Sequence, residues 1–98
     1  MSSVSAKKSD KDYVLVNIVE AVVREKTREL IKTMDMCCCE VCYLNACAIA
    51  LNSLKQLYVT TYKGALLSKI STIGVGYQAV LTCEIIKALM IVKASPRH

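Results

Sequence analysis

The sequence contains no phenylalanine and no tryptophan, and it has only one proline, three glycines and one histidine. The histidine is His98 at the end of the sequence, so a Cys–His nucleophile pair or a Ser–His–Asp triad would have to use a frayed terminus. Gly74 and Gly76 do not make a phosphate loop, because neither a Walker pattern nor a complete GxGxxG is present. These absences predict a protein without enzymatic activity.

Long uncharged apolar segments are also absent. Residues 73–92 come nearest, but Glu84 and Lys87 interrupt them, so no segment reaches the roughly 18 residues expected of a transmembrane helix. The charged first residues are not followed by an apolar run of the signal-peptide kind, since Glu20 and Arg24 soon appear. We therefore expect a cytoplasmic protein outside the membrane, whose cysteines are thiols or metal ligands rather than disulfides.

Apolar residues, by contrast, are abundant: 54% of the 98 residues are hydrophobic. A chain of this length forms one domain with a modest core. Such a high apolar fraction leaves hydrophobic surface exposed unless another subunit covers it. We expect a single small domain that forms a homodimer.

The chain divides into a polar tail and a helical domain. Residues 1–12 are rich in Ser and Lys, which predicts a disordered tail before a domain of residues 13–98. Within the domain, apolar residues recur at three- and four-residue steps, as in helices. The β-branched and aromatic residues around Tyr58 favour a short extended segment, which could pair with its own copy across a two-fold axis. The pattern predicts an all-α, four-helix domain with helices at about 13–34, 40–54, 63–71 and 77–94 and the extended segment at 55–61.

Positive charge is concentrated in the second half of the chain. The net charge is +5, and the residues after Asn52 carry six basic side chains against Glu84 alone, so this half is where an anion is expected to bind. These basic residues are spread rather than clustered, which argues against nucleic acid as the partner. In the first helix, Arg24, Arg28 and Lys32 form a basic stripe beside an acidic one, typical of a solvated face and compatible with phosphate binding.

The chemically distinctive stretch is Met36–Asn52, which holds five of the six cysteines. Cys37, Cys39 and Cys42 form a Cys-x-Cys-x-x-Cys pattern, and a loop can wrap such thiols around one soft ion such as zinc. Cys39 and Cys42 are expected in the first turn of a helix, where the helix dipole favours thiolate. A redox dithiol is the alternative for the Cys39-x-x-Cys42 pair, but the βαβ frame of thioredoxin-like proteins is not visible.

Taken together, a series of short motifs resembles the late competence development protein ComFB family. The resemblance runs from Val14 to His98, and the order and spacing of the motifs carry it. They are Val16-Asn17-Ile18-Val19-Glu20, Cys37-x-Cys39-x-x-Cys42, Ala48-x-Ala50-Leu51-Asn52-x-Leu54, Tyr58-Val59-Thr60, Lys63, Lys69 and Pro96-Arg97-His98.

The resemblance implies a small cytosolic, all-helical homodimer without a catalytic site. Zinc ligation by the cysteine pattern is known in this family, and members are reported as receptors for cyclic dinucleotides. A symmetric dimer has paired basic residues and paired tyrosines. The basic residues could bind the two phosphates of such a ligand, and the tyrosines could stack on its two purines. The residues that we expect to bind it are Arg24, Arg28, Tyr58, Lys63, Lys69 and Arg97.

The sequence departs from the family pattern at three places. Lys55-Gln56 stands where a proline-containing pair is usual, and Asn45 where an aspartate is common. Some metal-bearing relatives place a further cysteine just beyond the Pro-Arg, where this chain has His98. The predicted zinc ligands are therefore Cys37, Cys39 and Cys42, with His98 or Cys38 as the fourth; His98 is preferred because imidazole completes a Cys₃His site.

Two functions follow from these observations. The first is a cyclic-dinucleotide receptor, for cyclic di-GMP or cyclic di-AMP, with a possible downstream protein partner. The second is a zinc-stapled structural or protein-interaction module without a nucleotide ligand. The two are compatible if zinc only braces the loop.

Overall fold

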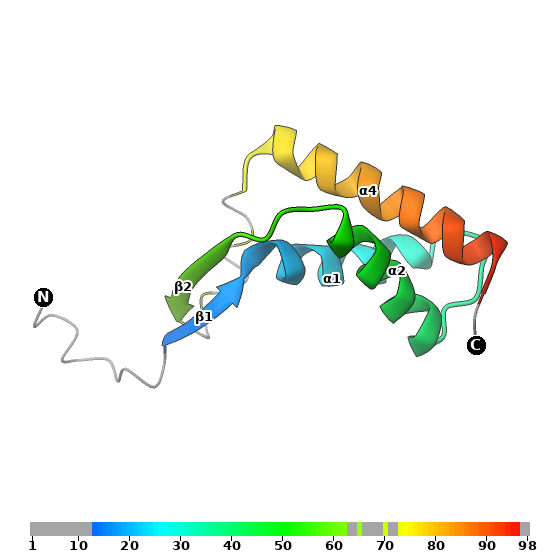
Figure 1. Cartoon of the computed structure of the whole chain (residues 1–98), viewed down its shortest axis with the longest axis horizontal. Coiled ribbons are helices and arrows are strands. Elements are labelled where there is room, and N and C mark those ends of the chain that lie inside the picture. Colours follow the sequence, from blue (N-terminus) through cyan, green and yellow to red (C-terminus); the bar gives the residue numbers. More distant parts are fainter. Residues whose placement is uncertain (1–12, 63–64, 66–69, 71–72, 97–98) are drawn as a thin grey trace, which may run out of the picture.

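The computed structural model describes residues 13–62, 65, 70 and 73–96. In chain order the elements are the strand β1 (Tyr13–Asn17), the helices α1 (Ile18–Ile31) and α2 (Glu40–Asn52), the strand β2 (Tyr58–Tyr62) and the helix α4 (Val75–Ala94). The described residues thus form three helices and a two-stranded antiparallel sheet. The prediction of an all-α, four-helix domain is wrong (Figure 1).

The correction concerns residues 13–17, which the helical spacing of Leu15 and Val19 assigned to the first helix. They form β1 instead, paired with β2 in a register that sets Tyr13 opposite Tyr62 and Asn17 opposite Tyr58. The rings of Tyr13 and Tyr62 lie 4.2 Å apart between centroids, the kind of cross-strand aromatic pair that stabilises a hairpin-like sheet. The extended segment thus pairs with β1 of the same chain.

Asn17 marks the point where strand gives way to helix. It has extended backbone angles, and its side-chain oxygen accepts a hydrogen bond from the Val19 N–H at 3.2 Å. The same oxygen accepts the Leu57 N–H at 2.9 Å, while the Ile18 N–H donates to the Leu57 carbonyl at 2.8 Å. One asparagine therefore caps α1 and ties it to the chain entering β2.

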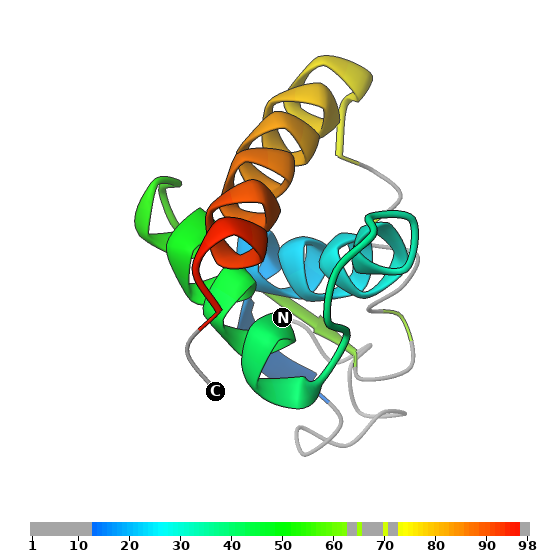
Figure 2. The same ribbon diagram turned by 90° about the vertical axis from the view of Figure 1, so that its right-hand side faces the viewer.

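The three helices enclose the core. α1 contributes one apolar face, α2 is buried through residues that include Cys42, Tyr43 and Ala46, and α4 packs against both. Figure 2 shows α4 crossing over α1 with its C-terminal turns beside α2. By length and composition α4 could also cross a membrane. Because Leu81, Ile85 and Leu89 on one side of it are fully buried in this core, we interpret it as a core helix.

Other predicted segments have mixed outcomes. α2 begins at Glu40 as predicted, and the last helix ends at Ala94 before Ser95-Pro96 as predicted. α1 ends at Ile31 rather than Met34. The predicted tail of residues 1–12 lies outside the described residues, as does nearly all of the predicted helix at 63–71.

Candidate functional site

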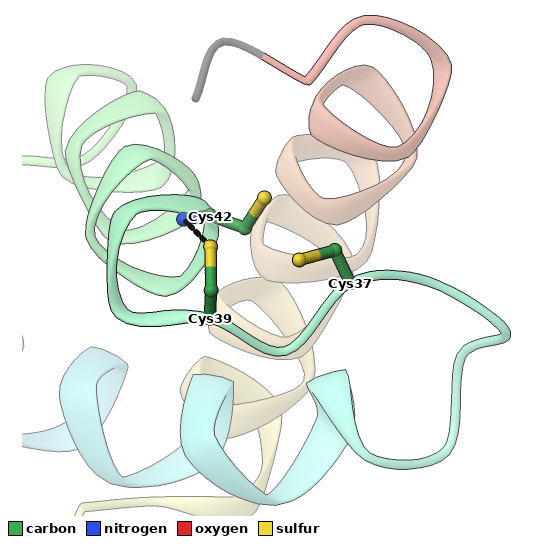
Figure 3. A group of neighbouring side chains, drawn as sticks. All are labelled: Cys37, Cys39 and Cys42. Carbon is green, nitrogen blue, oxygen red and sulfur yellow. Dashed lines mark hydrogen bonds between the residues drawn. The ribbon is translucent and has the colours of Figure 1, made fainter.

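Three thiols gather where the loop after α1 enters α2. The Sγ atoms of Cys37, Cys39 and Cys42 all lie within 4.8 Å of one another, and Figure 3 shows the three side chains as neighbours where the loop enters α2. With Zn–S bonds of about 2.3 Å, a tetrahedral site sets its sulfur atoms about 3.8 Å apart. A small contraction of this group would therefore accommodate a zinc ion.

The geometry of the cluster comes from the way α2 begins. Cys39 is the N-cap, and its Sγ accepts a hydrogen bond from the Cys42 N–H at 3.4 Å (Figure 3). This hydrogen bond lowers the pKa of Cys39. Burial, together with hydrogen bonds to the Cys39 and Cys37 thiols, raises the pKa of Cys42 to about 12. Without a cation the three thiols cannot all ionise, whereas a bound metal would take them as thiolates.

A fourth ligand is not found among the residues that the structure describes. Cys38 was one candidate, but its Sγ lies 3.6 Å from the carbonyl oxygens of both Ile31 and Met36 and donates toward them, outside the cluster. The other candidate, His98, lies outside the described residues. The chain thus offers three converging thiols and leaves one tetrahedral position open to a further donor.

Arg28 connects α1 to the start of α2 beside this cluster. Its guanidinium lies over the Tyr43 ring, 3.9 Å from the centroid, and its Nη1 is 4.0 Å from the Glu40 carboxylate. The Tyr43 hydroxyl donates to the Arg24 carbonyl at 3.0 Å, and burial raises the pKa of this tyrosine, so it stays a donor at neutral pH. These contacts fix the first turn of α2, and hence Cys39 and Cys42, against α1.

A surface hollow of about 360 Å³ lies between the start of α1 and the sheet. It brings together Arg24 and Tyr58, two of the predicted ligand residues from segments far apart in the sequence. Arg24 donates through Nε to the Glu20 carboxylate at 3.1 Å, which raises the pKa of the arginine. The residues lining the hollow are Leu15, Val16, Asn17, Glu20, Ala21, Arg24 and Tyr58.

The other predicted ligand residues are placed differently. Arg28 does not line this hollow, since it lies against Tyr43. Lys63, Lys69 and Arg97 lie outside the described residues. Sequence reasoning missed Asn17, although an asparagine followed three residues later by Glu20 is a known signature of a helix start. It also missed Leu15 and Val16, because a helix was expected there.

A second hollow, of about 380 Å³, lies between α2 and the end of α4. Its walls are mostly apolar, with Ile49 and Ile91 among them, and its polar groups are the amides of Asn45 and Asn52 and the Ser95 hydroxyl. Asn45 is half-buried at this open surface, without a side-chain hydrogen bond to any described residue.

Comparison with known proteins agrees with this architecture. The family described as "Late competence development protein ComFB" matches residues 16–96. A solved structure of the late competence protein ComFB from Bacillus subtilis has a TM-score of 0.69 at 24% sequence identity, covering 86% of this chain and 96% of that chain. At that identity the likeness concerns the fold alone. No curated protein matches the chain. Because the family match spans most of its length, the chain belongs to the late competence development protein ComFB family.

Proposed function

We propose that this ComFB-family protein is a non-enzymatic receptor for a cyclic dinucleotide, cyclic di-GMP or cyclic di-AMP, and that it acts as a cytoplasmic homodimer. The observation that carries the proposal is the hollow of about 360 Å³ in which Arg24 from α1 meets Tyr58 from β2. A guanidinium and an exposed phenol ring are the two groups that a nucleotide requires, one for phosphate and one for the base.

The chemistry of the hollow supports a phosphate at Arg24. Glu20 accepts a hydrogen bond from the Nε atom of Arg24, and arginine carries five N–H donors in a planar fork. The guanidinium therefore has further N–H donors with which it could bind a phosphate. Glu20 holds the side chain in place, but it also repels an anion, so binding at this position needs further positive charge.

Further charge would come from the remaining predicted ligands. Lys63, Lys69 and Arg97 belong to the basic second half of the chain and are proposed to complete the phosphate contacts. A second copy would double every contact, which suits a ligand that is itself two-fold symmetric. The receptor output would then pass to a downstream protein partner.

A calorimetric titration with cyclic di-GMP and with cyclic di-AMP tests this function. We expect micromolar binding of one of them by the wild type, and about tenfold or greater weakening by Arg24→Ala. Lys32→Ala is the matched control, because it removes one exposed positive charge from the end of the same helix, away from the hollow. An absence of heat for both nucleotides at millimolar concentration would rule out the receptor.

A second function, a zinc-braced structural or protein-interaction module, is favoured by a different observation, the three thiols within 4.8 Å. Cys37, Cys39 and Cys42 would hold the ion, with His98 proposed as the fourth ligand. Bound zinc would supply a cross-link, not a reactive group, and it would hold the loop after α1 against the first turn of α2. Metal analysis of freshly purified, reduced protein tests this; a full count of free thiols with no zinc contradicts it.

A further inference from the structure

Two thiols of the cysteine cluster lie within one helical turn of each other at the start of α2. Cys39 is the N-cap, and Cys42 is the third residue of the helix. Their Sγ atoms lie within 4.8 Å of each other, and the Cys39 sulfur accepts the Cys42 N–H at 3.4 Å (Figure 3). The first turn of α2 therefore holds this pair of side chains close together.

The separation of the pair suits a disulfide. A disulfide joins cysteines whose Cα atoms are about 4.4–6.8 Å apart, and one turn of helix rises by about 5.4 Å. The backbone therefore places the two residues within bridging range. Rotation of the side chains would close the remaining gap between the sulfur atoms, from at most 4.8 Å to a bond of about 2.0 Å.

The two thiols differ in their access to solvent. Cys39 is exposed, whereas Cys42 is buried, with 1% of its surface accessible. A small oxidant in solution can therefore reach the Cys39 sulfur, and the Cys42 sulfur lies beside it. An exposed thiol next to a second thiol that can resolve its oxidised form is the usual arrangement of a redox-sensing cysteine.

The other nearby cysteines are placed less favourably for pairing. Cys38 is next to Cys39 in the chain, but its thiol donates toward two backbone carbonyls outside the cluster. Cys37 is the third thiol of the cluster and is exposed, but it precedes the first turn of α2. The pair that the helix itself brings together is Cys39 and Cys42.

We propose that Cys39 and Cys42 form a reversible disulfide when the protein meets a hydroperoxide, and that this disulfide abolishes metal binding by the cluster. The proposal deepens the zinc-braced module, on which its consequence for the metal rests. Once the two sulfur atoms are joined, Cys37 is left as the remaining thiol of the cluster. Zinc needs thiolate ligands, and a single thiolate does not hold it, so the loop after α1 is no longer cross-linked to α2.

The reaction balances with hydrogen peroxide as the oxidant. The Cys39 sulfur attacks one peroxide oxygen, the O–O bond breaks, and the other oxygen leaves as water with the thiol proton, which gives a sulfenic acid. The Cys42 sulfur then attacks the Cys39 sulfur, the S–S bond forms, and the S–O bond breaks to release a second water. The two thiols lose two electrons and the peroxide gains them. A dithiol reductant reverses the step by thiol–disulfide exchange.

Peroxide treatment of the full chain, followed by alkylation and fragment-ion mass spectrometry, tests the pairing. The metal-free wild type is expected to give a disulfide between Cys39 and Cys42, with Cys37 alkylated. Cys39→Ser is expected to lower the yield of any disulfide within the cluster about tenfold or more. Cys38→Ser is the matched control, because it removes the adjacent exposed thiol and should leave the yield unchanged, as should Cys37→Ser. A disulfide that uses Cys37 or Cys38, or no disulfide at all, would overturn the proposal.

Zinc release into a colour-forming chelator separates this proposal from the zinc-braced module. The zinc-loaded wild type is expected to lose its metal in step with disulfide formation and to bind zinc again after reduction. A chain that forms the Cys39–Cys42 disulfide but holds no zinc when purified in reduced form contradicts the module alone. A chain that holds zinc, but keeps it under peroxide or loses it without this disulfide, contradicts the redox switch alone.

Discussion

The helices α1 and α2 both begin with a side-chain N-cap. The same type of hydrogen bond has a different role in each helix. At α1 the cap is Asn17, whose oxygen is fully engaged by the N–H groups of Val19 and Leu57. At α2 the cap is Cys39, whose sulfur accepts the Cys42 N–H and lies beside two further thiols. Serine, threonine, aspartate and asparagine are the preferred caps, so a thiol at this position gives up helix stability. The difference indicates that Asn17 has a structural role and that Cys39 is there for its chemistry.

Cys39→Ser is expected to separate the two roles most sharply. Serine is a better N-cap than cysteine and is too hard a ligand to replace a thiolate, so the metal-free protein should keep its stability while zinc affinity falls by about 100-fold or more. Metal content after dialysis against a competing chelator measures this loss. Cys83→Ser is the control, because Cys83 is exposed on α4 and outside the cluster. Equal zinc retention by both variants would contradict a ligand role for Cys39.

Asn17→Ala tests the structural cap. The change removes the acceptor of two N–H groups at once, and we expect the free energy of unfolding to fall by about 2 kcal/mol. Urea denaturation of metal-free protein measures it. Asn17→Asp keeps the acceptor oxygen and places negative charge at the start of a helix, so it should stay within about 0.5 kcal/mol of the wild type. If the alanine variant were as stable as the aspartate variant, Asn17 would not hold α1 to β2.

The free energy of unfolding of the metal-free protein should depend on pH in the alkaline range, because the three thiols lie close together. The folded pKa of Cys42 is raised to about 12 from 9.0, so between these values the unfolded chain loses a proton that the folded chain retains. Stability from this group is therefore complete below about pH 9 and declines as pH rises toward 12. Cys39, whose pKa is lowered, acts in the opposite sense near its own titration. Unfolding followed against pH should show a steeper alkaline decline in the wild type than in Cys42→Ala; parallel curves would contradict this assignment.

The sequence predicted α2 and its cysteine cluster well because both depend on local signals. Three thiols at positions i, i+2 and i+5 beside a helix start can meet without help from distant residues. The same reasoning failed at β1, where Leu15 and Val19 satisfy a helical period while Tyr13, Val14 and Val16 also have strand propensity. The decision is made by pairing with β2, some 45 residues later in the chain, and a contact of that separation leaves no local trace.

The ligand residues illustrate a further limit of sequence reasoning. Arg24 and Arg28 stand on one predicted stripe and are equivalent by spacing alone. In the folded chain Arg24 lines the hollow beside Tyr58, whereas Arg28 stacks on Tyr43. The tyrosine reaches Arg28 only because α2 packs across α1, so the division of roles is a property of tertiary packing. The spacing of charges along the sequence therefore does not distinguish Arg24 from Arg28.

Arg28→Ala is expected to give the smallest effect, and it tests how the start of α2 is held against α1. It removes the stacking on Tyr43 and an exposed 4.0 Å contact with Glu40, which together stabilise the fold by about 0.5–1 kcal/mol. Lys32→Ala removes the same charge from α1 without a ring partner and should change stability by less than about 0.5 kcal/mol. Urea denaturation in the presence of excess chelator compares the two. Because Tyr43 follows Cys42 directly, loosening this stack should also weaken zinc binding, whereas Lys32→Ala should not. Equal losses in both variants would mean that the start of α2 is positioned by the hydrophobic core alone.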